Sequence, residues 1–434
     1  MMEDEHQDFD EKCGNAAADH DAPSSGQPFS NSWRDEPLTS VESSKVTEIL
    51  RACKNGDREQ LAALATSSGG LVEDHVRRIA WPILLGNSPN DADHTDDWQR
   101  LPVHRDEEQV KLDVHRAFVY YPTGESEKQI DGRKRELSDL ITGLLRRHPC
   151  LHYFQGFHDI AQVLLLVLGA DQAAPLLARL SLLRIRDYML PTFSASETHV
   201  QLLPAIVYAT DPKLCQHLAR LQPYFAIAAT LTLYAHDIEE YGGISRLFDF
   251  LLAHEAVISV YMYATIIMTR KNELLEYEAD DEDMMYAILS KLPKPLDIEA
   301  LIARTTLLFA QHPPETLPFS AWRKVSKYSV LKTTRDPDAL STQTLEDGEH
   351  LHAKHAAQIK RQETLQKMTA HSRFLAYRYR KPAGAFTVAI VIGVLSLWLG
   401  RGGNGSSVPS LAMLLDAKDK LLWVISKAWT SLRP

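Results

Sequence analysis

The sequence predicts an all-α protein: a multi-helix body, a polar linker and one C-terminal hydrophobic helix. Apolar residues recur at intervals of three and four through most of the chain, as they do on one face of an α-helix. The long apolar runs at 226–235 and 257–269 lack the Gly and Asn turns that separate paired strands. The chain of 434 residues is 44% hydrophobic, which is enough to form a sizeable core.

The N-terminal part of the chain divides into a polar segment and a helical domain. Residues 1–42 are acidic and rich in Ser, Asn, Asp and Gly, and this composition predicts disorder. From residue 43 the helical pattern begins, and we expect one helical domain at 43–315. Within it, Asp211 followed by Pro212 is typical of a helix start, with Asp as the N-cap and proline in the first turn.

A polar segment at 316–382 follows the body, and we interpret it as a linker. Its apolar stripe is thin, so a helix formed there would be exposed and charged. Three histidines in this segment are expected to be solvated: His350, His352 and His355.

The segment 383–400 contains 18 residues without a charge, and we expect a transmembrane helix. At a rise of 1.5 Å per residue it spans about 27 Å, close to the hydrocarbon thickness of an ER-like bilayer. The alternative is a buried core helix. The flanks favour the membrane, because residues 378–381 are basic and aromatic and Trp398 and Arg401 close the segment. The positive-inside rule then predicts a single pass, with the N-terminal body in the cytosol.

The last segment, 409–432, is amphipathic and carries several charges, so we expect an interfacial helix there rather than a second span. Charge is divided unevenly along the chain. The net charge is −10, yet residues 354–434 contain 13 Lys and Arg against 3 Asp and Glu, which leaves −20 on residues 1–353. An acidic body argues against nucleic acid as a partner, and a basic tail suits anionic lipid headgroups.

We expect no metal or cofactor. His148, Cys150, His152 and His158 lie close in the sequence, but their spacing matches no zinc pattern. The four cysteines lie far apart without a C-x-x-C pair, so a disulfide scaffold is not indicated. The chain also lacks the G-x-x-x-x-G-K-[ST] loop that binds nucleotide phosphates.

Three short segments each have an ordinary structural explanation when taken alone. Arg78-x-x-Trp81 indicates a helix with the tryptophan in the core. Asp113 and Arg116 are spaced as a surface ion pair on a helix, worth a few tenths of a kcal/mol, roughly. Residues 153–155, Tyr-Phe-Gln, indicate an aromatic entry to a helix in which the glutamine satisfies backbone groups.

Together, and in this order, these segments resemble the TBC domain, the all-helical GTPase-activating domain that acts on Rab GTPases. The family's signatures are R-x-x-W, I-x-x-D-x-x-R and Y-x-Q, followed by an R-L-W-D segment. Here Val110 stands for the isoleucine, and Phe248 stands for the tryptophan before Asp249. The resemblance extends over about 68–312. With the C-terminal hydrophobic segment, the chain is most similar to the membrane-anchored, ER-resident branch of the family.

The resemblance implies roles for individual residues. Arg116 is implied to be an arginine finger and Gln155 a glutamine finger, both supplied in trans to accelerate GTP hydrolysis by a Rab. Asp113 would orient Arg116, and Tyr153 would brace the glutamine loop. The remaining motif residues are expected to be structural: Arg78, Trp81, Phe248 and Asp249.

The implied partner is a Rab GTPase in its GTP-bound state, which brings its own GTP and Mg²⁺. The protein itself would hydrolyse no GTP, and an ER location favours vesicle traffic from the ER to the Golgi. The competing hypothesis is a non-catalytic, membrane-anchored tether that binds a Rab, as expected of family members without the fingers. The presence of both Arg116 and Gln155 favours the active protein.

Overall fold

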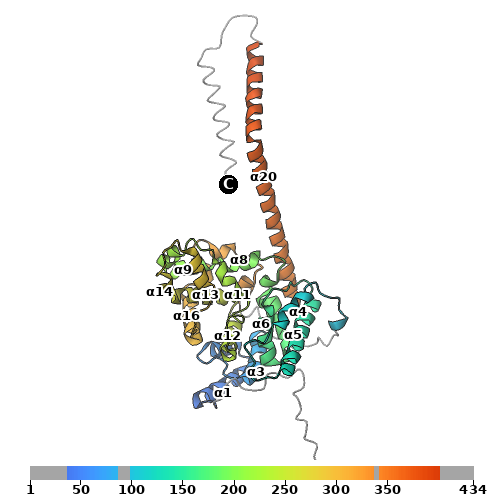
Figure 1. Cartoon of the computed structure of the whole chain (residues 1–434), viewed down its shortest axis with the longest axis vertical. Coiled ribbons are helices and arrows are strands. Elements are labelled where there is room, and N and C mark those ends of the chain that lie inside the picture. Colours follow the sequence, from blue (N-terminus) through green and yellow to red (C-terminus); the bar gives the residue numbers. More distant parts are fainter. Residues whose placement is uncertain (1–36, 87–97, 337–341, 401–434) are drawn as a thin grey trace, which may run out of the picture. The chain divides into compact units, whose positions relative to one another are not determined.

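The computed structural model describes three parts of the chain: residues 37–86, 98–336 and 342–400. All regular secondary structure in these ranges is helical, which confirms the predicted all-α class. The chain divides into two units, Met1–Lys360 and Arg361–Pro434, and many of the helices are labelled in Figure 1.

The first unit is built from helices of 4 to 21 residues, joined by short turns. They are α1 (Ser40–Asn55), α2 (Arg58–Thr66), α3 (Asp74–Leu84), α4 (Glu107–His115), α5 (Glu127–Arg147), α6 (Phe157–Leu168), α7 (Ala170–Arg179), α8 (Ser194–Val200), α9 (Leu203–Thr210), α10 (Pro212–His217), α11 (Ile227–Leu231), α12 (Tyr241–Ala253), α13 (Ile258–Thr269), α14 (Lys271–Leu274), α15 (Glu282–Leu289), α16 (Ile298–Gln311), α17 (Ala321–Lys324) and α18 (Val330–Thr333).

Short tight turns of helix complete the unit: η2 (Trp98–Arg100), η4 (Arg186–Met189), η5 (Pro223–Ala226) and η6 (Pro314–Thr316) are 3₁₀, and η3 (Leu180–Arg184) is π. The last helix, α20 (Leu345–Gly400), begins in the first unit.

The ends of two helices follow directly from local sequence. In α1, the Thr39 hydroxyl accepts from the Glu42 backbone and the Glu42 carboxylate accepts from the Thr39 backbone, a reciprocal cap. The helix therefore begins at Ser40, slightly before the predicted boundary at residue 43. In α10, Asp211 caps the helix and Pro212 occupies its first turn, as predicted.

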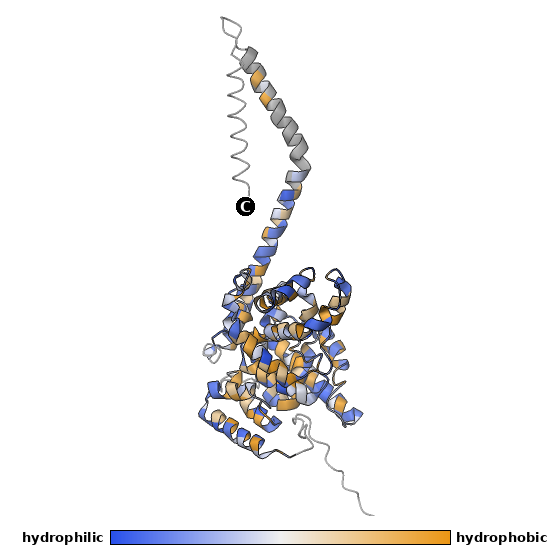
Figure 2. Ribbon diagram, turned by 90° about the vertical axis from the view of Figure 1, so that its left-hand side faces the viewer, coloured by the Kyte–Doolittle hydropathy of each residue, from blue (hydrophilic) through white to orange (hydrophobic). Residues whose placement is uncertain are grey.

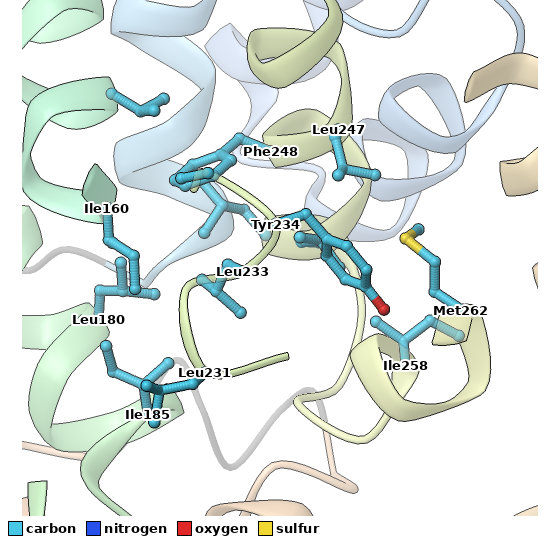
Figure 3. Close-up of a cluster of buried hydrophobic side chains, with 14 of the residues drawn as sticks. Ile160, Leu180, Ile185, Leu231, Leu233, Tyr234, Leu247, Phe248, Ile258 and Met262 are labelled. Carbon is cyan, nitrogen blue, oxygen red and sulfur yellow. The ribbon is translucent and has the colours of Figure 1, made fainter. Parts of the chain in front are cut away.

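The core of the first unit is apolar, and Figure 2 shows hydrophobic residues gathered inside the helical body with hydrophilic ones on its outside. Helix α6 is buried along almost its whole length, and α12 and α13 are nearly as deeply buried. Figure 3 shows part of this core, where side chains from distant segments meet: Ile160, Leu180, Leu233, Phe248 and Met262.

A buried carboxylate, Asp249 of α12, connects three segments of this core. Its oxygens accept hydrogen bonds from the Arg77 guanidinium at 3.0 Å, from the Trp81 indole at 2.9 Å and from the Leu71 backbone at 2.9 Å. Asp74 accepts a further bond from Arg77 at 2.8 Å. Burial alone would lower the pKa of Arg77, but the charges and hydrogen bonds of Asp249 and Asp74 outweigh it and raise that pKa.

The structure assigns the arginine of this network to Arg77 rather than to its neighbour in the R-x-x-W motif. Arg78 instead donates to the Val167 carbonyl at 2.8 Å, near the C-terminal end of α6. Both arginines thus stabilise helix packing, but only Arg77 pairs with Asp249. Trp81 and Phe248 are fully buried with ring centroids 6.0 Å apart, which confirms their predicted place in the core.

The predicted linker at 316–382 is wrong for residues 316–360, because the chain up to Lys360 belongs to the first unit. Val330 and Leu331 of α18 are buried, and Ser329 caps that helix. His352 and His355 are also buried rather than solvated. The apolar pieces that dock here are only a few residues long, so they produce no helical periodicity that a sequence pattern could show.

The second unit continues α20 to Gly400. Within the described ranges, no helix combines the length and the apolar character needed to cross a membrane. Most side chains of 383–400 lie outside the described residues, so the transmembrane helix stays a prediction. The predicted disordered segment up to residue 36 and the interfacial helix at 409–432 also lie outside them.

Replacing Trp81 or Phe248 with alanine is expected to destabilise the first unit by about 3–5 kcal/mol, because each leaves a cavity in a closely packed core. Denaturant unfolding of the full chain in detergent measures the change. The control is Leu112→Ala, since Leu112 is exposed and its loss should move stability by no more than about 0.5 kcal/mol. Near-native stability of both core variants would contradict the packing described here.

Candidate functional site

Arg116 lies just past the end of α4, where a buried carboxylate holds it. Asp113 is 0% exposed, and its Oδ1 accepts from Arg116 Nη2 at 2.6 Å and from Gln109 Nε2 at 3.0 Å. The side chain of Arg116 is itself 62% exposed. The buried carboxylate therefore orients the guanidinium, and the rest of the guanidinium is accessible to a partner.

The same carboxylate reaches a second segment. Tyr153 donates its hydroxyl hydrogen to Asp113 Oδ2 at 3.0 Å, so Asp113 bonds both motifs at once. Burial, followed by the charge of Asp113, raises the pKa of Tyr153, so the phenol stays protonated and remains a donor. Asp113 thereby fixes the arginine and the tyrosine in one arrangement.

Gln155 lies in the segment 148–156 between α5 and α6, which we call the glutamine loop. The Arg105 guanidinium donates to the carbonyls of Pro149 at 3.1 Å and Leu151 at 2.9 Å. The Tyr153 backbone N–H donates to the Asp106 carboxylate at 2.9 Å. Two adjacent side chains that precede α4 thus hold the loop backbone at three residues, which orders the loop without regular secondary structure.

Gly156 ends the loop and begins α6 with a φ of 97°, a conformation that favours glycine. A Cβ at this position would lie 2.6 Å from Thr232 Cγ2. The absence of a side chain therefore allows both the turn and the close approach of the segment around Thr232. The carboxamide of Gln155, one residue earlier, is exposed and makes no hydrogen bond within the described part of the chain.

Arg116 and Gln155 line one groove, with a volume of about 710 Å³. Aromatic side chains form much of its wall, and several of them are exposed: Tyr120, Phe193 and Tyr224. Exposed aromatic residues around a few polar groups are typical of protein-binding surfaces. The groove thus presents a cation and a carboxamide on a surface suited to another protein.

The polar part of the groove lining contains one carboxylate between two histidines. Asp159 lies 3.0 Å from His236 Nδ1 and 3.2 Å from His158 Nε2. The hydrogen bond to Asp159 raises the pKa of His236, whereas burial lowers the pKa of His158. With Arg116 beside this cluster, the groove holds charges of both signs although residues 1–353 are strongly acidic overall.

The structure brings four of the predicted site residues together: Arg116 and Gln155 at the groove, with Asp113 and Tyr153 supporting them. The other four, Arg78, Trp81, Phe248 and Asp249, lie outside the groove lining and serve packing, as expected.

Sequence reasoning missed supporting residues that act through the backbone. Gln162 accepts from the Phe118 backbone N–H at 2.9 Å, which fixes the chain just after Arg116 where Phe118 has a φ of 62°. The available signal was a lone glutamine in the otherwise apolar part of α6, because a buried amide requires a partner. Arg105 and Asp106 carried no comparable signal. In the described ranges, no group of three or more His, Cys, Asp or Glu is arranged to hold a metal ion.

Comparison with known proteins gives this site a context. Residues 74–275 match the family model described as the Rab-GTPase-TBC domain. The human protein TBC1 domain family member 20 is 33% identical over 337 residues, covering 76% of this chain and 83% of its own. The GTPase-activating protein gyp10 of Schizosaccharomyces pombe is 32% identical, covering 67% of this chain and 78% of its own.

A crystal structure of the Ypt/Rab-GAP domain of Gyp1p aligns with 62% of this chain and 99% of its own, at 14% identity and a TM-score of 0.49. With the matches at 32–33% identity, the chain belongs to the Rab-GTPase-TBC domain family.

The conformation and close packing of Gly156 predict that replacing it will destabilise the protein. Gly156→Ala should be more destabilising than Gly124→Ala, although both glycines have positive φ values, 97° and 83°. The strain of the left-handed conformation is worth about 1 kcal/mol at either position. Only Gly156 adds a steric clash, worth about 1–3 kcal/mol more. Thermal unfolding of both variants compares them, and equal losses would mean that the contact with Thr232 does not constrain the loop.

Proposed function

We propose that this chain is a GTPase-activating protein for a Rab GTPase in its GTP-bound state, with Arg116 and Gln155 as the two groups supplied in trans. The observation that carries the proposal is that these two exposed side chains line one groove, and that Asp113, the carboxylate that orients Arg116, is fully buried beneath it. Membership of the Rab-GTPase-TBC domain family names the class of partner.

Each group suits one difficulty of GTP hydrolysis. Negative charge accumulates on the phosphoryl oxygens in the transition state, and an arginine supplied by a second protein stabilises it, an effect worth about 10³–10⁵ in rate for known cases. A glutamine carboxamide accepts a hydrogen bond from the attacking water through its oxygen and donates one through its nitrogen. Gln155 can therefore orient the water while it contacts a phosphate oxygen.

The support under Arg116 gives it a preferred orientation before the partner binds. Asp113 is buried and bonds Tyr153 as well, so the arginine loses less freedom on forming the complex than an unsupported one would. Arg116 would exchange or share its bond to Asp113 when a phosphate approaches. The GTP and the Mg²⁺ that neutralise the rest of the charge belong to the Rab.

We also propose that the segment 383–400 spans the ER membrane, leaving the body in the cytosol, and that the protein regulates traffic from the ER to the Golgi. The support is the uncharged sequence of 18 residues and its basic and aromatic flanks. Anchoring would confine the protein and a membrane-bound Rab to one surface and raise their effective concentration.

Arg116→Ala and Gln155→Ala should each lower GTPase activation by at least about 100-fold, because each removes a group that acts in the transition state. The measurement is phosphate release from a panel of GTP-loaded Rabs with the full chain in detergent micelles. The melting temperature of Gln155→Ala should stay close to that of the wild type, since this side chain is exposed. Arg116→Ala should lower it modestly, because buried Asp113 loses its cation but keeps the hydrogen bonds from Gln109 and Tyr153. Lys111→Ala is the control, because it removes an exposed cation from α4, the helix that ends next to Arg116.

Two outcomes would separate the alternatives. Activity that survives in both variants contradicts the two-finger mechanism. Binding of a GTP-loaded Rab without acceleration by the wild-type protein favours the non-catalytic tether.

Deleting residues 383–434 should give a protein that leaves the membrane fraction and still activates its Rab in solution. The physical reason is that the groove and the described residues that support it all lie within the first unit. Alkaline carbonate extraction of cells tests the anchor: the full chain should stay with the membranes, and the truncated chain should enter the supernatant. A full chain that washes off with carbonate would contradict the transmembrane helix.

A further inference from the structure

The short helix η4 lies against the glutamine loop. The carbonyl of Met189 accepts from the His152 backbone N–H at 2.9 Å. The ring of Tyr188 packs edge-to-face on Phe154, the residue before Gln155, with centroids 6.2 Å apart. One hydrogen bond and one aromatic contact therefore tie η4 to the loop on either side of Tyr153.

The first turns of α20 contact the same two segments. His352 Nε2 lies 3.1 Å from the Met189 carbonyl, the oxygen that already accepts from His152. His355 Nδ1 lies 3.3 Å from Asp187 Oδ1, and Glu349 pairs with His148 at 2.7 Å, where the glutamine loop begins. Three polar side chains spaced along α20 thus reach either η4 or the loop itself.

The helix can come this close because of Gly348. A Cβ on Gly348 would lie 2.8 Å from Leu182 Cβ and 3.1 Å from the Leu182 carbonyl oxygen. Since one of these atoms belongs to the backbone, the contact cannot be relieved by turning a side chain. The close packing of α20 on η3 therefore requires a glycine at this position, and the contact of His352 with the Met189 carbonyl depends on that packing.

Helix η4 is also bonded to α8 and α18, so it has little freedom to move. A contact from α20 therefore affects the position of the glutamine loop. Asp187 is fully buried and bonds His199 of α8 at 2.9 Å and the Val330 backbone of α18 at 3.1 Å. Burial by itself raises the pKa of Asp187, but the hydrogen bond from His199 and the close approach of the His355 ring outweigh it and hold that pKa below its usual range. The carboxylate therefore stays charged and fully bonded.

We propose that the start of α20 is a positioning element for the glutamine finger, with His352 as the positioning residue that acts through the Met189 carbonyl. This inference rests on the role proposed for Gln155. His352 is only 3% exposed, and a polar ring buried in this way needs its partner. Without the N–H of His352, the Met189 carbonyl loses one of its two donors and is held only by the His152 amide.

Positioning of this kind affects the chemical step more than binding. A small displacement of Gln155 misplaces the attacking water, and a misplacement of about 1 Å can lower a rate by about 100-fold. The contact surface for the Rab is unchanged, because α20 does not line the groove.

Hydrogen exchange of the full chain in detergent micelles tests the positioning directly. His352→Phe keeps a ring but removes the donor, and it should speed exchange of the peptide covering 148–156 by about tenfold. His352→Gln, which retains an N–H at a similar reach, should restore much of the protection. Gly348→Ala should also speed exchange in 148–156 even though alanine favours helix. Gly132→Ala in α5 is the matched control, because its Cβ meets nothing within 4 Å.

Kinetics with a GTP-loaded Rab tests the consequence. His352→Phe should lower kcat by about tenfold while KM changes less than about twofold. In a Gln155→Ala background the same change should have no further effect, since the two residues act through one group.

Three results would overturn the proposal: unchanged exchange in 148–156 for both His352→Phe and Gly348→Ala, faster exchange spread evenly over the first unit, or an equal loss of kcat in the Gln155→Ala background. If exchange responds as expected but the wild-type protein accelerates no Rab, the positioning of the loop is supported and the proposed function is contradicted. The exchange measurement thus separates the two claims.

Discussion

The fold of the first unit depends on a buried carboxylate, Asp249, which accepts hydrogen bonds from an arginine, an indole and a backbone amide of two other segments. A charge in an apolar core is tolerated only when it is paired and fully bonded, so these partners specify each other. This constraint fixes α3 against α12 and also holds the turn at Leu71. Apolar packing alone would allow the helices to slide, whereas the directional bonds allow one register.

A buried carboxylate also holds the residues at the groove. Asp113 is as deeply buried as Asp249, but one of its partners, Arg116, is largely exposed. The buried Asp113 orients the arginine, and the exposure of Arg116 makes it accessible to a partner. A functional group that must meet a partner's charge without reorganising needs both properties, and a residue fully inside or fully outside the core would have only one.

A third buried carboxylate, Asp187, connects η4 to helices α8, α18 and α20. In each of these places a carboxylate joins segments distant in the sequence. The difference lies in what the joined segments do: one set builds the core, one presents the arginine, and one lies behind the glutamine loop. The start of α20 is therefore part of the architecture of the domain and not a spacer that follows it.

The sequence by itself determined the helical class and the core positions of Trp81 and Phe248, because periodicity and motif spacing are local properties of the chain. Its resemblance to the TBC family pointed to Arg116 and Gln155 as the candidate pair. Only the tertiary structure decided that Arg77, rather than Arg78, pairs with Asp249, and that His352 and His355 are buried. It also showed that the docked chain extends to Lys360. The physical reason is that two adjacent residues of the same type, such as Arg77 and Arg78, differ only in the side of the helix from which their side chains extend. Which of them meets a partner is set by the packing of segments far apart in the sequence, and no local pattern records that packing.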